Sequence, residues 1–151
     1  MSINLTFDSK ALGSGKGNYE TFVEMDSGDS ITVYPPNGWS IMGAKLYTGA
    51  ETGGNSNDGG SFTPDPQKAT DVASLRGNSG SYTTIFQNNP GFSASSFSIN
   101  VTNAGTADNS ATITDNLATG SLAAYEYLIW IQKAAGATTT NDFIDPGIRN
   151  R

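Results

Sequence analysis

Hydrophobic and polar residues alternate in short runs along the chain, and Gly, Pro, Asn or Asp bounds most of these runs. From residue 97 to residue 102 every second position is apolar, and the run from 30 to 34 is built in the same way. A period of two residues is that of a β-strand with one buried face. The pattern predicts about seven to nine strands. We expect them at residues 3–7, 21–25, 30–34, 39–47, 82–87, 97–103, 111–114, 125–133 and 142–148.

These strands predict a single all-β domain over residues 1–151, folded as an antiparallel β-sandwich. The segments between them have the residues that tight turns need. Pro35 and Pro36 remove strand hydrogen-bond donors, and the following Asn37 and Gly38 accept positive φ angles. No helical period persists beyond about two turns, which agrees with an all-β class.

Residues 48–74 interrupt the strand pattern and form one long polar loop in this prediction. Loops of such length are uncommon in compact domains and are often functional. We keep two interpretations. The first is a surface excursion that contains one short helix at residues 66–75. The second is a loop that contacts a ligand or a partner.

The chain contains no cysteine and no histidine. This excludes zinc sites of the Cys/His type, blue copper, and nucleophilic catalysis that depends on Cys–His or Ser–His–Asp. Calcium held by oxygen ligands and catalysis by a carboxylate pair remain open. We expect no cofactor.

The chain is acidic, with 14 Asp and Glu against 8 Lys and Arg. Nucleic-acid binding needs clustered basic residues, so we expect no nucleic-acid partner. The N-terminal residues lack the pattern of a signal peptide, and the longest strongly apolar stretch, residues 128–131, is too short to insert into a membrane. The abundance of Gly, Ser, Thr and Asn is compatible with an extracellular or surface role, although the compartment stays open.

Residues 121–127 precede the strongest strand and contain the motif Tyr125-Glu126-Tyr127. Tyr125 and Tyr127 resemble the tyrosine corner and the following buried position of immunoglobulin-like sandwiches. The same segment resembles cupredoxin-like domains, whose copper-binding cysteine would fall at Ile129. Since Ile129 cannot bind copper, the resemblance implies the sandwich fold without the metal.

The C-terminal part also resembles small bacterial proteins of unknown function. These proteins end in a Tyr-x-Tyr strand, a turn, and an Asp-Pro-x-Ile strand. Here the second motif is Asp145-Pro146-Gly147-Ile148. The resemblance covers about a quarter of the chain and implies no activity.

Four aromatic residues are candidates for a sugar-stacking platform: Tyr34, Trp39, Tyr47 and Trp130. Trp130 lies between two isoleucines in a strand that is apolar on both faces, which favours a core position. Trp39 follows the Pro-Pro-Asn-Gly turn and is the better candidate for an exposed ring. Packing in the core or at its rim is the alternative for Trp39.

The long loop contains the oxygen-rich sequence that starts at Asn55 and includes Asn57 and Asp58. These three residues and Trp39 are the candidate binding residues. The spacing does not match an EF-hand, because position 12 is a proline. A looser calcium site that combines Asp58 with Asp65 or Asp71 is one interpretation, and a polar loop without a ligand is the other.

Asp115, Asp142 and Asp145 are the carboxylates considered for catalysis. A glycosidase pair needs two carboxyl groups about 5–10 Å apart across a cleft. Turn and strand-end positions explain all three residues, so we assign no catalytic residue.

By exclusion, the sequence predicts a non-enzymatic structural or interaction module. Its partner would be another protein or a second copy of itself, paired through edge strands or apolar patches. The alternative is a lectin-like module that binds carbohydrate, with or without calcium, and it predicts an exposed Trp or Tyr beside polar side chains. A hydrolase with two converging carboxylates is the third hypothesis.

Overall fold

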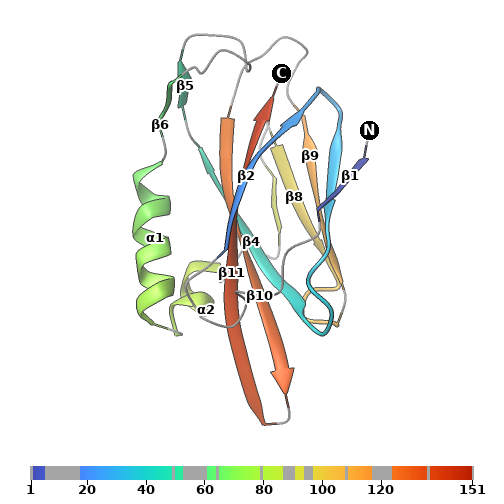
Figure 1. The fold of residues 1–151 in the computed structure, drawn as a ribbon, viewed down its shortest axis with the longest axis vertical. Coiled ribbons are helices and arrows are strands. Elements are labelled where there is room, and N and C mark those ends of the chain that lie inside the picture. Colours follow the sequence, from blue (N-terminus) through green and yellow to red (C-terminus); the bar gives the residue numbers. More distant parts are fainter. Residues whose placement is uncertain are drawn as a thin grey trace.

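The computed structural model describes most of the chain. The described residues are 2–5, 18–48, 50–52, 61–63, 65–78, 80–86, 91–93, 97–107, 109–116, 124–135 and 137–150. Within these ranges the chain is mostly β-strand, which confirms the all-β class (Figure 1). None of the described helices is long and apolar enough to cross a membrane.

The described residues form eleven strands and two helices. The predicted number of strands, seven to nine, is therefore not confirmed. Three strands have only three residues each, too few to show an alternating pattern. The elements are β1 (Ser2–Leu5), β2 (Asn18–Met25), β3 (Ser30–Val33), β4 (Ser40–Thr48), β5 (Ala50–Thr52), β6 (Ser61–Thr63), α1 (Pro66–Gly77), α2 (Ser81–Phe86), β7 (Gly91–Ser93), β8 (Phe97–Thr102), β9 (Ser110–Asp115), β10 (Ala124–Ala135) and β11 (Thr138–Asn150).

Two large sheets and one small one contain these strands. A five-stranded sheet has the order β1-β3-β9-β8-β7, and a four-stranded sheet has the order β2-β11-β10-β4. β5 and β6 form a two-stranded sheet of their own. Most neighbours are antiparallel, but β1 runs parallel to β3 and β2 runs parallel to β11. The N-terminal part of the chain thus adds one parallel edge strand to each large sheet.

The two large sheets face each other across one apolar layer, the inter-sheet core. Strand alternation directs one face of each sheet into this layer, and the burial pattern of β9 alternates without a break. The described members are mostly aliphatic, as expected for a dry core. They are Ile31, Val33, Trp39, Ile41, Ala44, Leu46, Ile99, Val101, Ala111, Ile113, Tyr127, Ile129, Ile131 and Ile144.

Asn109 links the two large sheets by taking the place of a strand neighbour. Its side-chain Oδ1 accepts the backbone N–H of Ile41 at 2.7 Å, and its Nδ2 donates to the Ile41 carbonyl at 2.9 Å. Asn109 lies in the loop between β8 and β9, in which Gly105 has a positive φ of 83°. The Gly105 N–H also donates to the Ile41 carbonyl, at 3.1 Å. These bonds satisfy backbone N–H and carbonyl groups at the edge of β4, which would otherwise need a further strand as their hydrogen-bond partner.

Helices α1 and α2 lie on the other face of the four-stranded sheet, away from the five-stranded sheet (Figure 1). They pack on a second cluster, the helix layer. Its buried members are Tyr47, Leu75, Tyr82, Phe86, Leu128 and Phe143, with Val72, Ile85 and Trp130 packed against them. The strands β4, β10 and β11 are therefore covered on both faces.

The structure corrects two predictions about this region. Residues 48–74 are not one long loop: they include the end of β4, the β5–β6 pair and most of α1. The helix expected at residues 66–75 is confirmed. The strand expected at residues 82–87 is wrong, because residues 81–86 form α2. Its sequence is rich in Thr, Tyr, Ile and Phe, which favour strands, but a helix places Tyr82 and Phe86 on one face against the sheet.

Candidate functional site

The outward face of the five-stranded sheet is a regular surface of short polar side chains. The buried residues of β3, β8 and β9 point into the inter-sheet core, so the residues between them point outward. All of these outward residues are half-exposed or exposed. We call this surface, together with Tyr34, the hydroxyl face. Its members are Ser30, Thr32, Tyr34, Ser98, Asn100, Thr102, Ser110, Thr112 and Thr114.

The strand register arranges these side chains in rows across the sheet. Thr112 of β9 is paired with Thr32 of β3 on one side and with Asn100 of β8 on the other. In the next row Thr114 lies between Ser30 and Ser98 in the same way. Directly paired side chains on one face lie within contact distance, and Thr–Thr pairs stabilise a sheet. The rows therefore form a continuous strip of hydroxyl and amide groups.

Tyr34 lies at the edge of this strip, and its side chain is exposed by 44%. It directly follows β3, in which Val33 is fully buried, so the alternation places Tyr34 on the outward side. The turn that follows is fixed by a hydrogen bond from the Trp39 N–H to the Pro36 carbonyl at 2.9 Å. Gly38 has a φ of 84° in this turn, as predicted from the sequence.

No member of the hydroxyl face carries a charge, although the whole chain has a net charge of −6. Its hydroxyl and amide groups can both donate and accept hydrogen bonds. Short side chains lose little conformational entropy when a ligand covers them. The face is thus suited to a neutral, hydrogen-bonding ligand, and Tyr34 adds an apolar ring surface at one edge.

The predicted binding residues lie elsewhere. Trp39 is exposed by only 6% and belongs to the inter-sheet core, so its candidacy as an exposed stacking ring is not supported and the core alternative holds. Trp130 packs in the helix layer, 5.8 Å from Tyr82 between ring centroids. Asn55, Asn57 and Asp58 lie outside the described residues.

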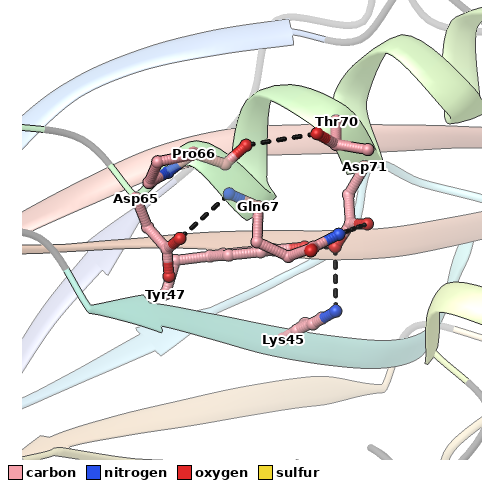
Figure 2. Close-up of polar contacts among 7 residues, drawn as sticks. All are labelled: Lys45, Tyr47, Asp65, Pro66, Gln67, Thr70 and Asp71. Carbon is pink, nitrogen blue, oxygen red and sulfur yellow. Dashed lines mark hydrogen bonds and ion pairs between the residues drawn. The ribbon is translucent and has the colours of Figure 1, made fainter.

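A second polar site lies between α1 and β4, where Asp71 collects three hydrogen bonds (Figure 2). Its Oδ2 accepts the Tyr47 hydroxyl at 2.5 Å and the Lys45 Nζ at 2.8 Å. Its Oδ1 accepts the Gln67 Nε2, also at 2.8 Å. At the start of the helix, the Asp65 Oδ1 accepts the Gln67 N–H at 2.9 Å, which is an N-cap. These bonds fix both the first turn of α1 and its position over the sheet.

Burial and these partners shift the pKa values of this group. Burial alone would raise the pKa of Asp71, but the hydrogen bonds from Lys45, Tyr47 and Gln67 outweigh it and hold the pKa below its ordinary value. The pKa of Tyr47 is raised strongly by its burial and by its bond to the Asp71 carboxylate. Asp71 is therefore a carboxylate and Tyr47 a neutral phenol at neutral pH.

Lys68 forms the next contact along α1, in a small pocket beside the helix. It is exposed by 6%, and its Nζ pairs with Glu126 at 3.0 Å and with Asp145. The pocket has a volume of about 250 Å³. It is lined by Asp65, Lys68, Ala69, Val72, Arg76, Glu126 and Asp145. The charges facing each other here already neutralise one another to a large extent, which suits a structural role.

The carboxylates considered from the sequence are not gathered in this site. Asp145 reaches the pocket, whereas Asp115 and Asp142 are exposed by 1% and 0%. Of the predicted calcium ligands, Asp65 caps α1 and Asp71 binds Lys45. Among the described residues, no group of three or more Asp or Glu could hold a metal ion.

Sequence reasoning named single members of these sites, such as Tyr34, Asp71 and Asp145, but did not predict the sites themselves. The hydroxyl face did leave a signal: the polar positions of three alternating runs are Ser, Thr or Asn throughout, where solvated surfaces usually include charged residues. Lys68, Glu126 and Asp145, which we call the Lys68 cluster, left no such signal in the sequence. These three residues are far apart in the sequence, and only the fold brings them together.

No family model and no curated protein matches the chain. Among solved structures, the chain is similar to the one described as "Structure of PbICP-C in complex with falcipain-2". The two share 12% sequence identity with a TM-score of 0.42, over 99% of this chain and 98% of that chain. A similarity of this size supports no conclusion about function.

Proposed function

We propose that this protein is a non-enzymatic binding module, that the hydroxyl face is its contact surface, and that its ligand is a neutral carbohydrate. The observation that carries this proposal is the uncharged strip of Ser, Thr and Asn side chains with the exposed ring of Tyr34 at its edge. Charged residues are depleted at the centres of binding interfaces, because charges are costly to desolvate.

The chemistry of the face favours carbohydrate over other ligands. A neutral sugar presents hydroxyl groups that donate and accept, as do the hydroxyl face's own side chains. It also presents a patch of C–H groups, for which the ring of Tyr34 is an apolar partner. A nucleic acid or an acidic glycan would need basic residues, and none belongs to this face.

The same face argues for binding rather than turnover. A hydrolase needs an acid and a base within reach of the bond to be broken. The hydroxyl face contains neither a carboxylate nor a basic side chain. Glu126 and Asp145, the two carboxylates that meet at Lys68, lie on the opposite side of the four-stranded sheet.

The decisive experiment measures binding to a panel of uncharged polysaccharides, such as mannan, dextran, xylan and β-glucan, by affinity electrophoresis and calorimetry. Tyr34→Ala removes the ring, and Thr112→Lys places a charge in the middle of the strip. We expect each to weaken binding about tenfold or more, which corresponds to the loss of one good contact. Thr83→Lys is the matched control, because Thr83 is an exposed threonine on α2.

Two results would contradict the proposal. One is the absence of binding to every neutral polysaccharide in the panel. The other is binding that Tyr34→Ala and Thr112→Lys leave unchanged while both variants keep the unfolding temperature of the parent.

We also propose that the two facing sheets form a β-sandwich that departs from the predicted antiparallel form at two edge pairs and is cupredoxin-like rather than immunoglobulin-like. The support is the parallel pairing of β1 with β3 and of β2 with β11. Immunoglobulin constant-type sheets are antiparallel. Ile129, at the position of the copper-binding cysteine in that resemblance, is fully buried in the inter-sheet core. A crystal structure in which these two edge pairs are antiparallel would contradict this assignment.

A further inference from the structure

The β10–β11 hairpin extends beyond the sheet to which it belongs. The pairs Lys133↔Thr140, Ala134↔Thr139 and Ala135↔Thr138 lie past the last pair between β10 and β4, which is Gln132↔Ser40. Figure 1 shows this end of the hairpin projecting from the body of the molecule. A two-stranded ribbon in this position has two long edges that the sheet does not cover.

The two edges of the ribbon differ. On the side of β11 that faces away from β10, pairing with β2 begins only at Ile144. In the described part of the chain, residues 138–143 therefore have no strand next to them on this side. On β10, the part of the strand opposite this segment contains Lys133, which is exposed. An exposed lysine is one of the features that protect the edge of a sheet from pairing with another chain. Thr138, Thr139, Thr140 and Asn141 of β11 carry no charge, and their register shows no bulge.

The side chains of this segment favour strand pairing. Threonine is β-branched and has a high preference for strands. Thr138 and Thr139 are exposed. At the base of the ribbon, the Asn141 Oδ1 accepts the Trp130 Nε1 at 2.8 Å and the Gln132 Nε2 at 3.1 Å. These bonds tie β11 to β10 at the base of the ribbon, so less conformational freedom is lost when a partner binds.

We propose that this edge of β11 is an interaction surface for a second copy of the chain. The segment 138–140 of one copy pairs antiparallel with the same segment of the other around a twofold axis at Thr139, which is the arrangement that a self-complementary edge produces. The absence of charge is what permits this pairing, since each copy has a net charge of −6 and most of its surface would repel the other.

Pairing over so few residues buries less surface than a permanent dimer needs. The association is therefore reversible and depends on protein concentration. It involves neither the hydroxyl face nor Tyr34, so it stands or falls separately from carbohydrate binding.

Sedimentation velocity across a wide concentration range tests the proposal. For the parent we expect a reversible rise from the mass of one chain towards that of two. Thr139→Lys should raise the concentration of half-association about tenfold or more, whereas Thr83→Lys should leave it unchanged. A parent that stays at the mass of one chain, or a Thr139→Lys variant that associates as the parent does, would overturn the proposal.

Cross-linking locates the contact, and the chain is suited to it because it has no cysteine of its own. We expect Thr139→Cys to form a disulfide-linked dimer under mild oxidation. Ala134→Cys is the matched control, because Ala134 is paired with Thr139 in the same ribbon but lies on the other strand. Equal cross-linking of the two variants would show that the contact does not use the edge of β11.

Discussion

The inter-sheet core and the helix layer flank the same strands but are built from different residues. On one side of β10, Ile129 and Ile131 meet aliphatic side chains of the five-stranded sheet. On the other side, Leu128 and Trp130 meet Tyr, Phe and Leu side chains, bordered by the ion pairs of Lys45 and Lys68. Aliphatic packing depends on volume and pattern alone, whereas buried charges stabilise only when each has its partner.

The difference suggests distinct roles in folding. Isoleucine and valine drive the two sheets together without selecting precise partners. The contacts of Asp71 and Lys68 fix where α1 lies and which way it points, at the cost of desolvating their charges. The two tryptophans of the chain lie one in each layer, Trp39 between the sheets and Trp130 beneath the helices. Fluorescence of the single-tryptophan variants Trp39→Phe and Trp130→Phe can therefore follow the layers separately.

The largest effect is expected from removing the charge at the centre of the Lys68 cluster. Lys68→Ala leaves Glu126 and Asp145 side by side, with side chains exposed by only 14% and 17%. Breaking a buried ion pair in this way typically costs about 3–5 kcal/mol, and we expect that loss in the free energy of unfolding from urea denaturation.

A neutral version of the same cluster separates charge pairing from packing. In the triple variant Lys68→Met, Glu126→Gln, Asp145→Asn no charge is left without a partner, so we expect most of the lost stability to return. If the triple variant is as unstable as Lys68→Ala, the cluster stabilises the helix layer by more than mutual neutralisation.

Cavities in the two layers should lower the free energy of unfolding by similar amounts, but they should destabilise different parts of the molecule. Ile129→Ala and Leu75→Ala each remove a large side chain that is at most 2% exposed, which costs about 2–5 kcal/mol. We expect Ile129→Ala to shift the urea transitions reported by Trp39 and Trp130 together. Leu75→Ala should shift the Trp130 transition further, because the helices can open locally. Coincident transitions in Leu75→Ala would mean that the layers unfold as one cooperative unit.

Two buried tyrosines of the helix layer provide a finer test. The Tyr47 hydroxyl donates to Asp71, whereas the Tyr82 hydroxyl has no hydrogen-bond partner among the described residues. We expect Tyr47→Phe to lower the unfolding free energy by about 1–3 kcal/mol, since Asp71 loses a donor. Tyr82→Phe should be neutral or stabilising by up to about 1 kcal/mol, since it removes a buried polar group that has no partner. Equal losses in the two variants would contradict this assignment.

Sequence patterns predicted the inter-sheet core much better than the helix layer. The strands at residues 30–34 and 97–103 were found from alternation alone, because one buried face imposes a period of two. The same reasoning made residues 82–87 a strand. There the preferences of Thr, Ile and Phe were outweighed by packing of Tyr82 and Phe86 on the sheet, which no local pattern records.

The candidate sites show the same limit. Trp39 was chosen for its place after a turn, yet the chain carries its ring into the inter-sheet core. The residue that replaces it, Tyr34, was one of the four aromatic candidates, and its alternation with Ile31 and Val33 already placed it on the polar side of its strand. Asn109 acts through backbone groups of Ile41, 68 residues away, and a contact of this kind has no signature in the sequence.

The smallest effect we predict is a dependence of stability on pH that comes from Asp71. Its pKa in the folded protein lies below the ordinary value of about 3.9 for an unfolded chain. Asp71 therefore stabilises the fold above that value, and the contribution is lost as the pH falls through the folded pKa. We expect the urea midpoint to fall in acid less steeply for Asp71→Asn than for the parent, because the amide has no proton to take up. Parallel curves for the two proteins would show that acid acts on other carboxylates, and the contrast between a charged helix layer and an aliphatic core would then have no consequence for stability in acid.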